Sequence, residues 1–242
     1  MCFSLKLLGK LTILGSAWDD TLGGLAFDKV IWNKMNEDFI AKYKVDTRKN
    51  KRAQVKLLEA SEKVKKTMSA NSIDIPLNLE CLMDDKDVSG KINREQFEEL
   101  SAPLIARIKA TLAAGLECSG LKKEDLYAVE IIGGASRMPC FKGAVKEVFG
   151  LDPSTTLNTD EAACRGAALK CAILSPTFRV REFSIVDSVI NEVTIAWAAD
   201  GTGANQGSLK IFDKKGPFPF TKAMTIFRKV SYTSVVKFFG QI

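Results

Sequence analysis

The hydrophobic and polar positions of this chain recur with two different periods, and each period predicts one kind of element. Phe27, Val30, Ile31 and Met35 recur at helical spacing within residues 25–45, with polar residues between them. Residues 49–70 are rich in strong helix formers. We therefore predict two long helices in the first third of the chain.

The apolar positions then change to alternation. Residues 73–79 place an isoleucine or leucine at every second position, which predicts a strand, and Pro76 indicates an edge position or a bulge. Residues 84–90, DDKDVSG, predict a hairpin turn that leads into a short Lys-Ile strand. Asn93 with Gln96 three residues later is the signature of a capping box, so a helix should begin there.

The same stretch also resembles a calcium loop. Read from Asp85, side chains with oxygen atoms fall at several of the loop positions that bind calcium, and Gly90 falls at the sharp turn. Such a loop needs a helix entering it and a glutamate at its last position. Here a strand is predicted to enter, and Gln96 stands at the end. Calcium binding is therefore kept only as a remote alternative.

The middle of the chain predicts alternating helices and strands. Residues 97–116 have one apolar helical face, which Pro103 should kink or split. Residues 125–132 predict a buried strand that ends in a glycine turn, and Pro139 suits the first turn of the next helix. A further helix is expected within residues 157–176, with Asn158 as its N-cap and Glu161 as the partner in the cap.

The character of the sequence shifts after this helix. Residues 179–188 are a mixed connector, and from Val189 onward short strand-like runs are separated by turn residues, which predicts antiparallel β-structure. The expected fold class is α/β followed by a partial antiparallel β-sandwich. We expect one domain over residues 1–178, a linker at 179–188 and a truncated β-sandwich at 189–242.

Composition narrows the possible functions. The 242 residues include six cysteines without close pairing and no histidine, which argues against a zinc site and against histidine-based catalysis. The net charge of +6 is modest, and no basic run is interleaved with aromatic residues, so we expect no nucleic-acid partner. No apolar run is long enough for a membrane span, and no secretory signal stands out, so we expect a cytoplasmic location, with the nucleus as a further compartment.

Three groups of residues suggest a binding site. Glu62, Lys65, Lys66 and Ser69 are spaced to share one face of a helix, where they could hold a ribose and contact a base. A solvated charged face explains the same spacing. Both interpretations stay open on these residues alone.

The second group is the turn that contains Gly133, Gly134 and Arg137. Glycines there let the backbone approach a ligand closely, and the Arg137 guanidinium could stack on a base, although a tight turn explains the glycines equally well. The third is Asp160 in the first turn of a predicted helix. A carboxylate at that position is favoured by the helix dipole in any case.

Five motifs together resemble one family. LGGLAFDKVI, EKVKKTMSA, IIGGASRMPCFK, LNTDEAACRGAALKCAILSP and VREFSI occur in the order found in 70-kDa heat-shock-protein superfamily chaperones. The motif KTMSAN and the polar connector resemble the 110-kDa branch most closely. The resemblance covers residues 10–198. It implies the second lobe of an actin-like ATPase domain, joined to the start of the β-sandwich substrate domain.

The resemblance also implies roles for particular residues. Glu62 and Lys65 would hold the ribose of ATP or ADP, Lys66 and Arg137 would sandwich the adenine, and Ser69 would bond the adenine edge. Gly24, Gly133 and Gly134 would line the backbone side, with Asp160 as a support. Lys66 replaces an arginine, and Ala135 a serine, of many 70-kDa members, and each change weakens these contacts.

The first lobe of this family supplies the phosphate loops, the magnesium ligands and the catalytic groups, and residues 1–20 match none of these motifs. We therefore expect a fragment that keeps the adenosine side, with no hydrolysis and no catalytic residue of its own. Magnesium would bind only if the first lobe were supplied. The resemblance implies a stress-response chaperone and nucleotide-exchange factor, whose partners are 70-kDa heat-shock chaperones and unfolded client proteins, without a membrane. The alternative is a protein-interaction module that works without nucleotide.

Overall fold

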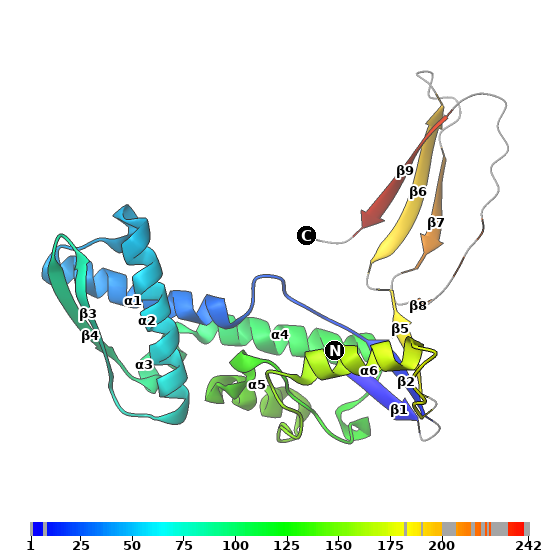
Figure 1. Ribbon diagram of the computed structural model, residues 1–242, viewed down its shortest axis with the longest axis horizontal. Helices are drawn as coiled ribbons and strands as arrows, with labels where there is room; N and C mark the ends of the chain where they lie inside the picture. Colours follow the sequence, from blue (N-terminus) through cyan, green and yellow to red (C-terminus); the bar gives the residue numbers. More distant parts are fainter. Residues whose placement is uncertain are drawn as a thin grey trace. The chain divides into compact units, whose positions relative to one another are not determined.

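The computed structural model describes residues 2–6, 9–181, 183–189, 191–199, 207–213, 216–218, 221, 223 and 232–239. The chain divides into two compact units (Figure 1). The helical unit contains residues 19–113 and 123–167, and the strand unit contains residues 1–18, 114–122 and 168–242.

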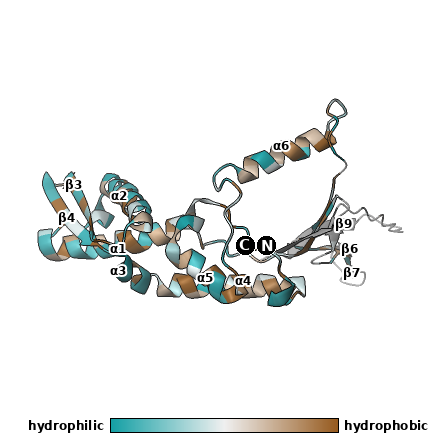
Figure 2. Ribbon diagram, turned by 90° about the horizontal axis from the view of Figure 1, so that it is seen from below, coloured by the Kyte–Doolittle hydropathy of each residue, from teal (hydrophilic) through white to brown (hydrophobic). Residues whose placement is uncertain are grey.

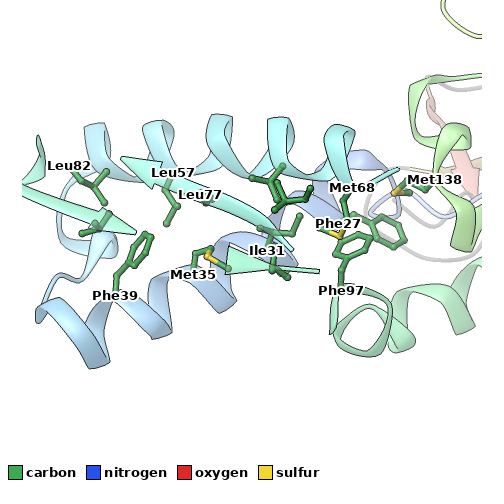
Figure 3. Packing of buried hydrophobic residues seen from close by; sticks show 14 of the residues in the cluster. Phe27, Ile31, Met35, Phe39, Leu57, Met68, Leu77, Leu82, Phe97 and Met138 are labelled. Atoms are coloured by element: carbon green, nitrogen blue, oxygen red, sulfur yellow. The ribbon is translucent and has the colours of Figure 1, made fainter. Parts of the chain in front are cut away.

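The core of the helical unit lies where two helices cover a β-hairpin (Figure 3). Phe27, Ile31 and Met35 lie on one buried face of the first helix, as their spacing predicted, and Phe39 extends this face. The elements that build this core are α1 (Gly24–Tyr43), η1 (Thr47–Lys49), α2 (Lys51–Ala70), β3 (Ile75–Met83) and β4 (Lys86–Ile92).

The hairpin has a shorter turn than the sequence predicted. Asp84 and Asp85 both have a φ of 53°, which is the left-handed geometry of a two-residue hairpin turn. Strand β4 therefore begins at Lys86, and the prediction of a seven-residue turn with a two-residue strand was wrong. Aspartate tolerates the left-handed conformation, so no glycine was needed to make the turn. A strand does enter this turn, as predicted, instead of the helix that a calcium loop requires.

Gly90 is fixed by packing. It pairs with Leu77 across the hairpin, and a Cβ atom added to it would lie 2.7 Å from the sulfur of Met35. Helix α1 can therefore approach β4 only because this position has no side chain.

The predicted break near Pro103 is confirmed. Helix α3 (Arg94–Leu100) is followed by its C-cap Ser101, and α4 (Ala102–Ser119) begins directly after that residue. Asn93 caps α3 as predicted, since its side-chain oxygen accepts a hydrogen bond of 3.0 Å from the Gln96 backbone N–H.

The strand predicted over residues 125–132 was wrong. The segment makes one isolated bridge, from Glu130 to Ser154, and Tyr127 is fully exposed. A strand needs a neighbour along its length, and no pattern in this segment reports whether one is present. The glycine turn that follows is η3 (Gly134–Arg137), and α5 (Pro139–Phe149) begins with the predicted proline.

The last helix is α6 (Ala162–Leu174). The predicted cap residue Asn158 accepts hydrogen bonds from the backbone N–H groups of Asp160 and Glu161, at 2.9 and 3.1 Å. Asp160 therefore lies in the capped turn directly before α6. No helix of the described ranges combines the length and hydropathy that a membrane crossing requires.

The strand unit contains two sheets. In one, β2 (Lys10–Gly15) lies between β1 (Cys2–Lys6) and β5 (Ser184–Ser188), and β5 also pairs with β8 (Pro217–Phe218). In the other, β6 (Glu192–Ala199) pairs in antiparallel fashion with β7 (Gly207–Phe212) and β9 (Tyr232–Phe239). The predicted α/β class, followed by antiparallel strands, is confirmed. The division into residues 1–178, 179–188 and 189–242 stays a prediction.

Candidate functional site

One cavity of the helical unit, with a volume of about 830 Å³, collects all the predicted site residues. They come from four separate segments of the sequence: the start of α1, one face of α2, the turn that leads into α5, and the capped turn before α6. The predicted residues that line it are Gly24, Glu62, Lys65, Lys66, Ser69, Gly133, Gly134, Arg137 and Asp160.

The polar face of α2 forms one wall. Lys66 Nζ lies 2.7 Å from Glu62 Oε1, and this hydrogen bond is the main reason that the pKa of Glu62 falls below its ordinary value. Glu62 is therefore ionised at neutral pH and can accept hydrogen bonds from hydroxyl groups of a ligand. The Ser69 hydroxyl donates to the Lys65 carbonyl at 3.0 Å.

Lys65 and Asp28 form an ion pair at the back of the cavity. Lys65 Nζ lies 2.7 Å from Asp28 Oδ1 and donates to the Gly24 carbonyl at 3.0 Å. The two side chains are only 10% and 9% exposed. Burial raises the pKa of Asp28, and the Lys65 ammonium offsets part of that effect. The Lys65 head group therefore joins α2 to the first turn of α1.

The glycine turn forms the opposite wall. Gly133 has φ 91° and ψ 147°, a conformation that residues with a side chain rarely adopt. Its N–H donates to the Thr159 carbonyl at 2.8 Å, and its own carbonyl accepts the Ser136 hydroxyl at 2.7 Å. Both backbone polar groups of Gly133 are therefore hydrogen-bonded, and the shape of the turn depends on glycine at this position.

Arg137 and Asp160 make the rim. Arg137 Nη2 lies 2.5 Å from Asp160 Oδ2 and 2.8 Å from the Thr159 hydroxyl. Both side chains of the ion pair are 60% exposed. The carboxylate and hydroxyl hold one edge of the guanidinium, and an exposed guanidinium plane is the part of arginine that stacks on aromatic rings.

Sequence reasoning missed several residues of this cavity. Asp28 follows Phe27 on the buried side of α1, and a carboxylate inside an apolar helical face was the signal that could have revealed it. Leu25 and Ile132 line the same cavity, although they are 54% and 51% exposed. Exposed apolar side chains beside ionised groups suit a ligand with a flat apolar part and hydroxyl groups.

One protein-family model matches most of this chain. The model of the family described as "Hsp70 protein" matches residues 4–229. The chain belongs to the Hsp70 family. The resemblance inferred from the motifs is therefore confirmed, and the relatives described next fit the 110-kDa branch.

The similar proteins are heat-shock proteins several times longer than this chain. It is 48% identical to heat shock 70 kDa protein 4 of Homo sapiens over 93% of its own length and 27% of the relative. It is 46% identical to heat shock 70 kDa protein 4L of Homo sapiens, over 91% and 26%. It is 44% identical to the 97 kDa heat shock protein of Mesocentrotus franciscanus, over 95% and 26%. The chain thus spans about a quarter of these relatives.

Proposed function

We propose that the helical unit of this Hsp70-family chain binds ATP or ADP through the adenosine part of the nucleotide. The observation that carries the proposal is that the nine residues implied by the family resemblance all line one cavity of about 830 Å³. Cavities of roughly 300–1,000 Å³ are typical of small-molecule sites.

The chemistry of the lining fits adenosine. The ionised Glu62 carboxylate, with its lowered pKa, can accept hydrogen bonds from both hydroxyls of a ribose. The Arg137 guanidinium can stack on the adenine ring, with Leu25 and Ile132 offering apolar contact. The ammonium of Lys65 already binds the Gly24 carbonyl and Asp28. Its role is therefore to hold the Gly24 backbone in position beside the ligand.

The test is isothermal titration of the purified chain with ADP and, separately, with adenosine. Since all the proposed contacts are to the adenosine part, both ligands are expected to bind with similar, weak affinity. Arg137→Ala should weaken both about tenfold, which corresponds to about 1.4 kcal/mol of binding free energy. Glu62→Ala should weaken both as well.

Arg165→Ala is the matched control. Arg165 also forms an exposed ion pair, 2.7 Å from Glu161, but it does not line the cavity. It should leave both affinities unchanged. If neither ligand binds, or if Arg137→Ala and Arg165→Ala have equal effects, the proposed site is wrong. If ADP binds far more tightly than adenosine, phosphate-binding groups are present and the adenosine-only assignment is wrong.

We further propose that the chain contributes to a heat-shock chaperone that keeps unfolded clients soluble and acts as a nucleotide-exchange factor for 70-kDa partners. The family match and the names of the relatives support the chaperone class. A pull-down of a 70-kDa chaperone by the purified chain tests the partner. Capture that weakens in the Glu62→Ala, Arg137→Ala double variant supports a nucleotide-dependent role, whereas capture that is unchanged favours the nucleotide-independent module.

A further inference from the structure

The net positive charge of the chain is concentrated in one short segment. Residues 42–56 contain seven of the 35 lysines and arginines and one of the 29 acidic residues. The remaining chain therefore holds 28 basic and 28 acidic residues and has no net charge. The whole excess of +6 lies within these 15 residues.

The structure brings most of these cations to one exposed surface, which we call the basic cap. It lies where α1 ends, η1 follows and α2 begins, and α2 is coloured mostly as hydrophilic in Figure 2. Within the part of the chain that the structure describes, Arg48 of this surface forms an ion pair with Asp46 at 2.9 Å. The basic cap consists of Lys42, Lys44, Arg48, Lys49, Lys51 and Arg52, all of them exposed.

Helix stability does not explain this placement. Lys51 and Arg52 occupy the first turn of α2, which contains no acidic residue. The helix dipole makes that end positive, so two cations there are unfavourable by roughly 0.3–1 kcal/mol each. A sequence selected only for a stable α2 would place acidic residues at these positions.

The backbone under the basic cap is rigidly held. The buried Asn36 side chain accepts hydrogen bonds from the Thr47 backbone N–H at 2.9 Å and from its hydroxyl at 2.5 Å. Asn50 caps α2 by accepting from the Arg52 N–H at 2.9 Å, and the Gln54 side chain donates to the Arg48 carbonyl at 2.8 Å. A fixed backbone lowers the entropy lost when a partner binds to the side chains that it carries.

We propose that the basic cap is a docking surface for an acidic segment, rich in aspartate and glutamate, of a partner protein. Charge complementarity of this kind favours association and its rate. The exposed Val55, 56% accessible and one turn into α2, offers an apolar contact to such a segment. A nucleic acid fits less well, because the nearby Tyr43 is engaged by Ser89 at 2.9 Å and packs edge-on against Phe39.

The test uses a fluorescently labelled peptide of about twelve glutamates and the full purified chain, followed by fluorescence anisotropy. The Lys49→Gln, Lys51→Gln, Arg52→Gln variant should bind the peptide at least about tenfold more weakly at low salt. Its thermal midpoint should stay equal or rise, because two unfavourable charges leave the start of α2. Raising the salt concentration should weaken binding to the unaltered chain.

The matched control removes three exposed lysines of the helical unit outside the basic cap: Lys29→Gln, Lys123→Gln, Lys142→Gln. It carries the same change in net charge and should keep most of the affinity. Equal losses in the two triple variants would mean that only overall charge matters, and the proposal would be wrong. It would also be wrong if the peptide did not bind at low salt, or if a uridine oligonucleotide of equal length bound more tightly through the same three residues.

Discussion

Lys65 Nζ lies 2.7 Å from Asp28 Oδ1, and more than four-fifths of each side chain is removed from water. The pair connects the second half of α2 with the start of α1, and both residues line the cavity. Because burial raises the pKa of Asp28 even beside an ammonium group, the charged carboxylate costs free energy that Lys65 only partly offsets. Neither partner can be removed alone without penalty.

Lys65→Met should lower the free energy of unfolding by about 3 kcal/mol at pH 7, since it leaves a buried carboxylate without a cation. The pKa of Asp28 is already raised, and losing Lys65 raises it further. In this variant the folded state favours the protonated form of Asp28. The variant is therefore most stable at low pH and loses stability as the pH rises through the raised pKa of Asp28. Urea unfolding should show a deficit that is large at pH 7 and much smaller near pH 4.

The double variant Asp28→Asn, Lys65→Met is the control for this pH dependence. It has no titrating group at the pair, so the difference between pH 7 and pH 4 that is specific to Lys65→Met should disappear. A deficit in Lys65→Met that is equally large at both pH values would contradict the assignment to Asp28.

Gly133→Ala should destabilise the fold by about 2 kcal/mol, because the backbone at Gly133 has φ 91° and ψ 147°. Gly134→Ala is a close control. A Cβ atom at either position would meet nothing within 4 Å, but only Gly133 has a positive φ. Thermal unfolding should separate the two variants, and equal midpoints would mean that the turn adapts to a side chain.

Asn36→Ala should destabilise the chain by about 2–3 kcal/mol, since it leaves the buried Thr47 N–H and hydroxyl without their acceptor. Lys34→Ala on the same helix removes an ion pair with Asp38 whose side chains are about one-third exposed, and it should cost less than about 0.5 kcal/mol. Chemical denaturation monitored by tryptophan fluorescence would measure both. Similar costs would argue against the role assigned to Asn36.

Cys140 should react slowly with iodoacetamide at pH 8. Burial, with a smaller contribution from Glu98, raises the pKa of its thiol to about 11, so little reactive thiolate is present. The exposed Cys81 should be alkylated readily under the same conditions. Mass mapping of the two peptides in the folded chain and in urea gives the comparison, and a Cys140 as reactive as Cys81 before unfolding would show that the site is open.

Local periodicity predicted the parts of this fold that depend on neighbours along the chain. The buried face of α1, the cap at Asn93 and the break before Pro103 all follow from residues within a few positions of each other. The strand expected at residues 125–132 failed because strand formation depends on a partner elsewhere. The two-residue turn at Asp84 and Asp85 was missed because left-handed aspartates carry no mark in a hydrophobic pattern.

In the site, too, local features could be predicted from the sequence, whereas contacts between distant segments could not. The stripe from Glu62 to Ser69 was visible from its spacing, but spacing could not show that the stripe would face Gly133 and Arg137. That expectation came from the family resemblance. The carboxylate of Asp28 within an apolar helical face could have marked it as unusual, but its partner Lys65 lies 37 positions away and could not be identified from local pattern.

Helix α2 carries the basic cap at its first turn and the polar wall of the cavity along its second half. With a rise of 1.5 Å per residue, Arg52 and Glu62 lie about 15 Å apart along the helix axis. At physiological ionic strength the Debye length is about 8 Å, so charges at one place are largely screened from the other. A polyanion that occupies the basic cap should therefore leave adenosine affinity unchanged, because dissolved ions screen the two surfaces from each other even though one helix connects them.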